Sequence, residues 1–465
     1  MSLFRTAQLF AFLILAFAWP SQMATNAAEP LRAGTSASTS PGAISQPRFE
    51  DTPVPVVSSP IQEELSLPKL LDEVRARNPS LQAMAAAWQS AAQRYPQAIS
   101  LEDPMFMAMA APASFDSDLV NPGYTLQGSQ KFPWFGKRAA RGRQAQAESQ
   151  AAYHDLEDSK NRLDEITSTA FYQYYLARRS LDLNRNNLEV ILQFQKTAQS
   201  KYEGNLVTQQ DVLQAELEAA DLERRNLELV RMDRVSIARI NMLLGNEPSC
   251  PLAPPPTELS LPSIPLDVCL LQQLAIRRRP DLAALRSRVQ AAEAAETLAG
   301  KSYYPDTEVF GRYDAMWQEN PLKPAVGVNL NVPIYRGRLD AAVMESRFTV
   351  NQRRAEYEQL VLDIQYEVTS EFEQVDESRK VLKLYSERLL PAATQNVAAA
   401  RSNYDVNKSS FLDLATAERR LIEIREKREE AAAMYHSRFA ELVRAVGGAI
   451  DGGPDEEEMP PPGSR

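Results

Sequence analysis

The chain of 465 residues repeats its own pattern about 201 residues further along, and this duplication constrains the fold more than any other feature. Residues 132–138 (FPWFGKR) return as residues 332–338 (VPIYRGR), and residues 244–245 (LG) return as 446–447 (VG). The offset stays between 200 and 202 over about 110 residues, so the two copies align almost without gaps. Each copy is far longer than a solenoid repeat, so the sequence predicts one structural unit used twice within a single architecture.

The first 28 residues have the pattern of a secretory signal peptide. Arg5 is the only charge before an apolar run at residues 9–19, and Ala27 and Ala28 provide small residues for cleavage. The chain after this segment has no uninterrupted apolar run of about 18 residues, so we expect no conventional membrane-spanning helix. The mature protein is therefore predicted to be exported.

The remainder divides into two repeats with irregular segments around them. Residues 29–62 are rich in Pro, Ser and Thr, which predicts a disordered leader. Residues 63–247 form repeat 1, residues 248–267 a Pro-rich linker, and residues 268–447 repeat 2. Residues 448–465 are acidic and Pro-rich, which predicts a disordered tail.

Charge and composition exclude several classes of function. A net charge of −10 argues against nucleic acid as a partner. His154 and His436 are the only histidines, and no nucleophile motif or phosphate-binding loop is recognisable, so we expect neither an enzyme nor a cofactor. A structural zinc site is not expected either, because its usual ligands are too few.

Cys250 and Cys269 are the only cysteines, and they flank the linker between the repeats. In an oxidising compartment they could form a disulfide that closes this segment. The alternative is two unpaired small residues, and the sequence does not decide between the two.

Each repeat reads as a helix, two strands, a very long helix, a sharp turn and a returning helix. The long helix of repeat 1 runs from near Lys137 to about Lys201 without a proline. Its counterpart runs from near Gly337 toward Tyr404 and is broken only at Pro391. About 65 helical residues would span about 100 Å, which predicts coiled-coil-like packing or a helical barrel.

The short segments between the helices alternate between apolar and polar residues. Residues 325–332 alternate strictly, residues 306–315 do so except at Phe310, and residues 124–132 follow the same pattern. Strands of about 9–10 residues with one apolar and one polar face suit a membrane β-barrel, although a soluble sheet with one buried face would look the same. Four strands cannot close a barrel alone, so several chains would have to share one.

Together these features resemble the outer-membrane efflux protein family of the TolC type, over roughly residues 63–447. The resemblance rests on the duplicated layout, on residues 130–137 (QKFPWFGK) where a strand turns into the long helix, and on the paired helix tips at residues 202–215 and 404–417. The junction sequence is more similar to the heavy-metal branch of the family than to its multidrug branch.

The resemblance implies a homotrimer that is mainly α-helical with a small membrane β-barrel. Twelve strands, four from each copy, would form a pore surrounded by outer-membrane lipid, and the long helices would form a periplasmic α-barrel. This duct would passively conduct substrates, here heavy-metal cations, from an inner-membrane pump of the resistance-nodulation-division type. A periplasmic adaptor, or membrane fusion protein, would join the pump to the duct.

The resemblance also assigns roles at the helix tips. Tyr404 matches a tip tyrosine, Asp211 the aspartate to which it hydrogen-bonds, and Asp413 the first of two aspartates that constrict the pore. The second falls on Thr416, and a tip arginine falls on Ser409, so we expect a weaker gate with one acidic ring. The alternative is that both aspartates merely cap helices. The tips predicted to contact the adaptor or pump are Gly204, Asn205, Leu206, Val207, Asn407, Lys408, Ser409 and Ser410.

Met105, Met107 and Met109 share one face of the first expected strand. Methionine is an ordinary filler of apolar surface, and the sequence favours this interpretation, with the three side chains toward lipid. The alternative is contact with a soft metal ion, for which thioethers are suitable ligands.

Other functions stay open from the sequence. One is a secreted coiled-coil enzyme or structural rod, although the alternating strands and the lack of active-site residues count against it. The duct could serve multidrug efflux or type I protein secretion. A periplasmic adaptor is a different class, but it should have one helical hairpin and several soluble β-domains, whereas this chain has two hairpins and four strands.

Overall fold

The computed structural model describes residues 64–115, 121–204, 207–260, 267–316, 318–406, 408–409 and 411–450. The chain divides into two units, residues 1–60 and 61–465, and every described residue belongs to the second. The predicted signal peptide and leader lie outside the described residues, as does the tail from residue 451.

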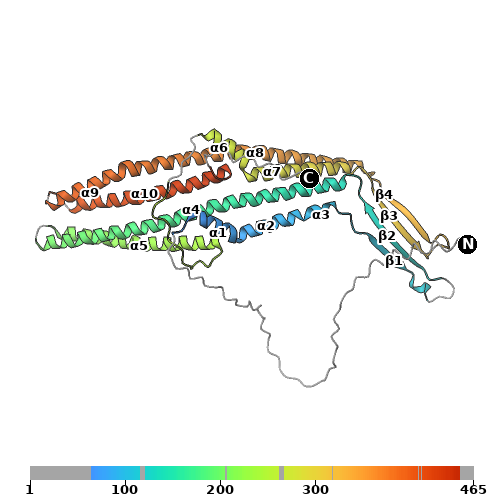
Figure 1. Ribbon diagram of the computed structural model, residues 1–465, viewed down its shortest axis with the longest axis horizontal. Helices are drawn as coiled ribbons and strands as arrows, with labels where there is room; N and C mark the ends of the chain where they lie inside the picture. The colour runs from blue at the N-terminus through green and yellow to red at the C-terminus, as the bar shows by residue number, and fades with distance from the viewer. Residues whose placement is uncertain are drawn as a thin grey trace, which may run out of the picture. The chain divides into compact units, whose positions relative to one another are not determined.

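Both repeats follow the predicted order of helical segment, two strands and long helical hairpin (Figure 1). The single first helix that the sequence predicts is three helices in repeat 1 and two in repeat 2. Repeat 1 contains α1 (Leu67–Arg77), α2 (Pro79–Ala92), α3 (Arg94–Ile99), β1 (Met105–Ala110), the 3₁₀ turn Pro112–Ser114, β2 (Tyr124–Phe132), α4 (Lys137–Glu203) and α5 (Gln209–Leu244). Repeat 2 contains α6 (Val268–Arg278), α7 (Pro280–Lys301), β3 (Asp306–Asp314), β4 (Pro324–Asn331), α8 (Arg336–Leu384), the π-helical turn Tyr385–Leu389, α9 (Leu390–Asp405) and α10 (Phe411–Val446).

The ends of these helices follow from local chemistry. Asn78 caps α2 by accepting a hydrogen bond from the Ser80 backbone N–H, and Pro79 supplies the first helical residue. Gly245 ends α5 with φ of 73°, a left-handed conformation that glycine adopts without strain. Pro391 does not end the long helix of repeat 2. Proline has no backbone N–H to donate to the preceding turn, and the helix widens there into a π-helical turn before α9 continues.

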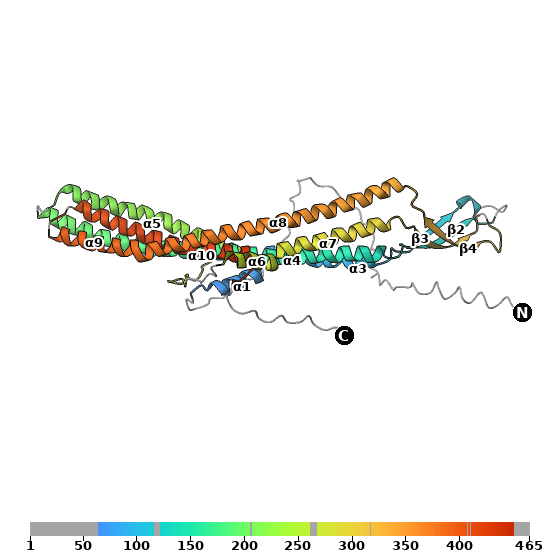
Figure 2. The ribbon, with the colours of Figure 1, turned by 90° about the horizontal axis from the view of Figure 1, so that it is seen from above.

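The helices of the two repeats pack against each other along their length. α4 contacts α5 of its own repeat and α7 and α10 of repeat 2, and the two views place these helices side by side (Figures 1 and 2). Each repeat has its own apolar core. The core of repeat 1 includes Leu70, Phe171, Tyr174 and Ile240, and that of repeat 2 includes Leu271, Ile364, Val368 and Leu442.

The four strands form one antiparallel sheet in the order β1-β2-β3-β4. β2 of repeat 1 pairs with β3 of repeat 2 at its centre, which leaves β1 and β4 as the two edge strands. The sheet extends from the point where α3 and α7 end and α4 and α8 begin (Figure 1).

Within the described residues, no helix combines the length and the apolar character that crossing a membrane requires.

Candidate functional site

The strand register assigns every sheet residue to one of two faces. Residues paired directly across antiparallel strands point to the same side. One face is mostly apolar and includes Phe106, Ala108, Leu126, Phe132, Val309, Tyr313, Val326, Val328 and Leu330. The opposite face is polar and includes Thr125, Gln127, Ser129, Lys131, Asp306, Glu308, Arg312, Asp314, Asn329 and Asn331.

The register corrects the expected orientation of the three methionines. Met105 pairs with Ser129, Met107 with Gln127 and Met109 with Thr125, so all three belong to the polar face. The expectation that they extend the apolar face is therefore wrong. Alternation within β1 alone showed that they share a face, but only the pairing with β2 reveals which face it is.

Phe310 is the one exception to alternation that the sequence showed, and the structure explains its position. Its ring lies over Gly327, the residue that it pairs with on β4, where a Cβ would approach the ring to 2.4 Å. Glycine at this position leaves the room that an aromatic side chain needs on the polar face.

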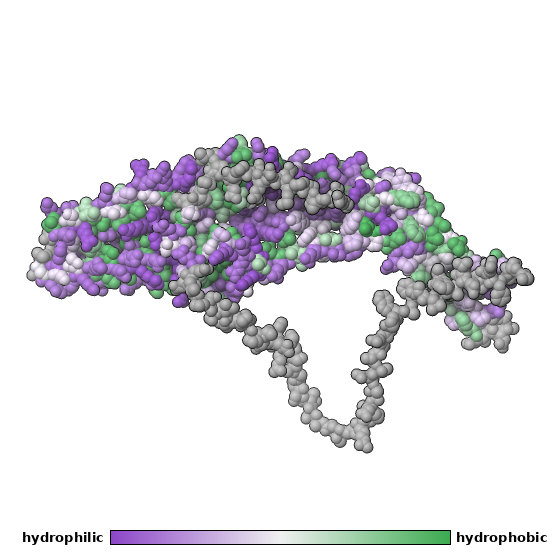
Figure 3. Space-filling model, in the orientation of Figure 1, coloured by the Kyte–Doolittle hydropathy of each residue, from purple (hydrophilic) through white to green (hydrophobic). Residues whose placement is uncertain are grey.

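The junctions between strands and long helices combine a buried ion pair with exposed apolar residues. Lys137, at the start of α4, donates hydrogen bonds to Asp306 at 2.8 Å and to the Tyr304 carbonyl at 2.9 Å, although its side chain is almost completely buried. Trp134 stacks on Tyr304 with ring centroids 5.3 Å apart. Figure 3 shows apolar surface gathered near this end of the helices, and Phe135, Ile334 and Tyr335 are among its exposed side chains.

At the hairpin tips, Tyr404 occupies a small buried core. It is 4% exposed and packs with Ala215, Leu414 and Ala415, so it joins the hairpins of both repeats. The ammonium group of Lys201, which sequence reasoning missed, lies 3.8 Å from the centre of the Tyr404 ring and donates to the Tyr404 carbonyl at 3.2 Å. A cation over the face of a buried aromatic ring stabilises this contact by about 1 kcal/mol.

Asp211 lies near Tyr404 and also caps its own helix. Its carboxylate accepts hydrogen bonds from the backbone N–H and the hydroxyl of Thr208, both at 3.0 Å. Burial raises the pKa of Tyr404, and the negative charges of Asp211 and Asp405 raise it further. Asp211 thus lies close enough to Tyr404 for its charge to affect the hydroxyl group. The hydrogen bond between the two side chains stays a prediction.

The other predicted tip residues divide between described and undescribed positions. Asp413 is exposed in the first turn of α10, and Thr416 is exposed one turn later. Gly204 ends α4, and Val207, Lys408 and Ser409 lie in the turns. The positions outside the described residues are Asn205, Leu206, Asn407 and Ser410.

Two further polar contacts link the hairpins, and neither was predicted from the sequence. Arg419 of α10 forms an ion pair with Glu218 of α5. Further from the tips, Glu429 is only 2% exposed and accepts a hydrogen bond from the Tyr175 hydroxyl at 3.2 Å. Arg428 also pairs with Glu429. The charged residues looked like ordinary surface helix positions, because sequence spacing does not show which helices meet.

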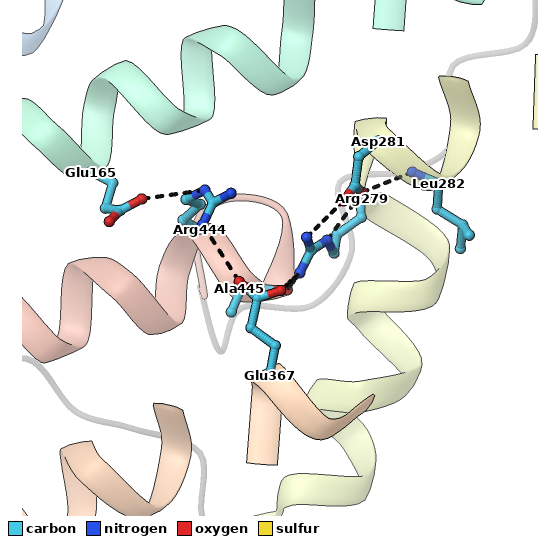
Figure 4. A network of polar contacts seen from close by, with 7 residues as sticks. All are labelled: Glu165, Arg279, Asp281, Leu282, Glu367, Arg444 and Ala445. Carbon is cyan, nitrogen blue, oxygen red and sulfur yellow. Dashed lines mark hydrogen bonds and ion pairs between the residues drawn. The ribbon is translucent and has the colours of Figure 1, made fainter. Parts of the chain in front are cut away.

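A network of charged residues joins α4, α7, α8 and α10 at the C-terminal end of α10 (Figure 4). Arg279 is 7% exposed, pairs with Asp281 at 2.7 Å and with Glu367, and donates to the Ala445 carbonyl. Arg444 bridges Glu165 of repeat 1, at 3.2 Å, and Glu367 of repeat 2, at 3.5 Å.

Burial and ion pairing have opposite effects on the pKa values of Arg279 and Glu165 in this network. Burial would lower the pKa of Arg279, but the hydrogen bonds and charges of Asp281 and Glu367 outweigh it and raise the pKa. Burial raises the pKa of Glu165 more than Arg444 lowers it. The network therefore favours the charged form of Arg279 and disfavours ionisation of Glu165.

The described residues hold two free thiols and no conventional metal cluster. Cys250 is half-buried and Cys269 exposed, and both are free cysteines in the structure. No group of three His, Cys, Asp or Glu residues in the described ranges is arranged to hold a metal ion.

The sequence model of the outer membrane efflux protein family matches residues 70–245 and 271–448. A search of curated proteins found no match for the chain. Solved structures with the same fold include the outer membrane protein VceC from Vibrio cholerae, with 20% identity and a TM-score of 0.70 over 83% of this chain and 97% of VceC. The channel protein CusC has 16% identity and a TM-score of 0.72, over 83% of this chain and 93% of CusC. The open outer membrane channel MtrE from Neisseria gonorrhoeae has 16% identity and a TM-score of 0.69, over 82% and 89%.

The chain belongs to the outer membrane efflux protein family, because the family model matches both repeats and more than half of the sequence. The family consists of outer-membrane channels with helical periplasmic parts that act with adaptors and inner-membrane pumps.

Proposed function

We propose that three copies of this chain form the exit duct of a tripartite efflux system. The observation that carries this proposal is the sheet: four strands with β1 and β4 at its edges, one apolar face and one polar face. In lipid the outer edges of β1 and β4 must find partners, and copies of the same chain supply them. Twelve strands then enclose a water-filled pore with the polar face inside.

In this duct the helices extend into the periplasm, and the hairpin tips face the adaptor and the inner-membrane pump. The pump supplies the energy, and the duct conducts passively. We further propose heavy-metal cations as the substrate class and a pump of the resistance-nodulation-division type, both from the similarity of the junction at residues 130–137 to the heavy-metal branch.

The gate is proposed to combine a latch and an acidic ring. Tyr404, held by the tip core and by Lys201, would latch the hairpins together beside Asp211. Three copies of Asp413, exposed in the first turn of α10, would form a ring of carboxylates that favours cations.

Single-channel recording in planar bilayers tests the gate. Wild-type protein should form cation-selective channels, and Asp413→Ala should change both conductance and cation preference. Thr416→Ala is a matched control, because it removes a neutral side chain one turn away. Unchanged conductance and selectivity in Asp413→Ala would leave Asp413 as a capping residue only.

Two further experiments separate the alternatives. Sodium carbonate washing of membranes should leave the protein in the pellet, whereas a periplasmic adaptor without a membrane-embedded part would be extracted. A deletion strain should be sensitive to Cu, Ag, Co, Zn or Cd salts but not to dyes and antibiotics. Sensitivity to organic compounds alone would favour multidrug efflux, and loss of an exported protein would favour type I secretion.

A further inference from the structure

The three methionines of β1 occupy a position that packing does not explain. Met105, Met107 and Met109 are 72%, 45% and 53% exposed and point to the polar face of the sheet. Three of the twelve methionines of the chain thus lie within one strand of six residues, Met105–Ala110. An apolar side chain that faces water gains nothing from burial, and three of them in one row place three thioether sulfurs on an exposed surface.

The polar face is the more enclosed side of the sheet, as the lumen of a closed ring of strands would be. Thr125, Ser129 and Asp314 on this face are each less than 10% exposed. On the opposite face, Phe106 and Val326 are 84% and 85% exposed. The methionine side chains therefore project into the partly enclosed space that the proposed duct would fill with water.

Cationic groups on this face have acidic partners, so the face does not repel a cation. Arg312 Nε lies 4.0 Å from Asp314 Oδ2, and Lys131 Nζ lies 3.4 Å from Glu102 Oε2. Glu308 accepts a hydrogen bond from Asn329 at 3.2 Å and adds a further negative charge.

Thioether sulfur is a soft, neutral ligand that prefers Cu(I) and Ag(I) to hard cations. Alternate residues of a strand are about 7 Å apart, and methionine has three rotatable side-chain bonds, so two neighbouring sulfurs can converge on one ion. Because the ligands carry no charge, an ion would exchange along the row and would not be trapped, which is what a conducting path needs.

We propose that Met105, Met107 and Met109 form a thioether row that binds a soft monovalent cation, Cu(I) or Ag(I), on the lumen face of β1. This inference rests on the proposed function and narrows its substrate class to soft cations. The row would be repeated in each copy of the duct.

Direct binding of Ag(I) tests the proposal with the purified full-length protein in detergent. Cys250 and Cys269 are free thiols that would bind Ag(I) themselves, so the background carries Cys250→Ser and Cys269→Ser. Equilibrium dialysis against AgNO₃ in nitrate buffer, with the bound silver counted by mass spectrometry, gives affinity and stoichiometry. Replacing Met105, Met107 and Met109 by Leu keeps apolar side chains of similar volume and removes the sulfur.

The triple variant should bind Ag(I) at least about tenfold more weakly than the background, since all proposed ligands are gone. The matched control replaces three exposed methionines of the helices, Met232, Met242 and Met344, by Leu and should bind like the background. Equal affinity of the background and the β1 triple variant would overturn the proposal. Met107→Leu alone should already weaken binding and serves if the triple variant does not fold.

Channel formation is measured separately in KNO₃, so the two proposals fail in different ways. Channels that conduct K⁺ in a protein that shows no methionine-dependent Ag(I) binding would refute the thioether row and leave the duct intact. Absence of channels would refute the duct whatever the silver measurement gives.

Discussion

Asn78 and Arg279 occupy equivalent positions in the two repeats, and each fastens the end of the returning helix in its own repeat. The Asn78 side chain donates to the Leu243 carbonyl at 2.9 Å, and the Arg279 side chain donates to the Ala445 carbonyl at 3.3 Å. Both residues precede a proline that starts a helix, and both are 7% exposed. The two repeats thus share the contact with the end of the returning helix but differ in the side chain that makes it. The longer arginine also reaches Glu367.

Arg279→Ala should destabilise the protein by about 2–3 kcal/mol, because Asp281 loses its ion pair with Arg279 and Glu367 keeps only Arg444. Thermal unfolding of the purified protein measures the effect. Adding Glu367→Gln should not recover the loss, because Glu367 still pairs with Arg444 in the single variant. Arg277→Ala, an exposed arginine on the preceding helix, should change stability by less than about 0.5 kcal/mol. Equal effects of Arg277→Ala and Arg279→Ala would contradict the role of the network.

His436 should make the folded protein sensitive to acid. Its ring is 4% exposed and stacks on Tyr172, and burial lowers its pKa to about 4, whereas an unfolded histidine titrates near 6.5. Because the folded-state pKa is the lower one, the contribution to stability is complete above about pH 6.5 and is lost as the pH falls toward 4, up to about 3 kcal/mol.

Thermal unfolding at pH 7.5 and 4.5 checks this expectation by comparing wild type with His436→Phe, which keeps an aromatic ring and cannot take up a proton. The variant should lose less stability than wild type on acidification. His154→Phe removes the other histidine and should behave like wild type. An equal loss in wild type and His436→Phe would show that other groups account for the acid sensitivity.

The ion pair between Glu218 and Arg419 should help to keep the proposed gate closed, because it joins the hairpins of the two repeats near their tips. Its partial exposure limits its contribution to about 1 kcal/mol. Glu218→Arg places two arginines together and should raise the open probability in single-channel recordings. Reversing both residues, Glu218→Arg with Arg419→Glu, should restore wild-type behaviour. If the double reversal stays as open as the single variant, the pair does not hold the hairpins.

Much of the fold could be predicted because the signals were local or repeated. Alternation located Tyr124–Phe132 as a strand, and the absence of proline together with the following Gly204 located the helix Lys137–Glu203. The orientation of Met107 could not be predicted, since it depends on pairing with Gln127 on another strand. Likewise, Lys201 and Arg279 are unremarkable as sequence letters, and their roles follow from the aromatic ring and the carboxylates that other helices bring to them.

The duplication also predicts how neighbouring copies would pair. β2 corresponds to β4 with an offset of 200, as Pro133 corresponds to Pro333. Ser129 of β2 therefore corresponds to Asn329 of β4. Ser129 pairs with Met105 and Asn329 pairs with Glu308, so β1 corresponds to β3 with an offset of 203 (308 − 105). Within one chain, Gly128 of β2 pairs with Gly311 of β3. If β4 of one copy pairs with β1 of the next in the same way, the equivalent residues Val328 and Ala108 lie opposite each other on the apolar face.

Disulfide cross-linking between these edge strands tests the shared sheet directly. In a background with Cys250→Ser and Cys269→Ser, the variant with Ala108→Cys and Val328→Cys should form covalent dimers and trimers in outer membranes on mild oxidation. The control with Ala108→Cys and Asn329→Cys places one thiol on the opposite face and should stay monomeric. Covalent trimers in the first variant alone are the predicted result, whereas monomers in both, or equal cross-linking in both, would contradict a duct built from three copies.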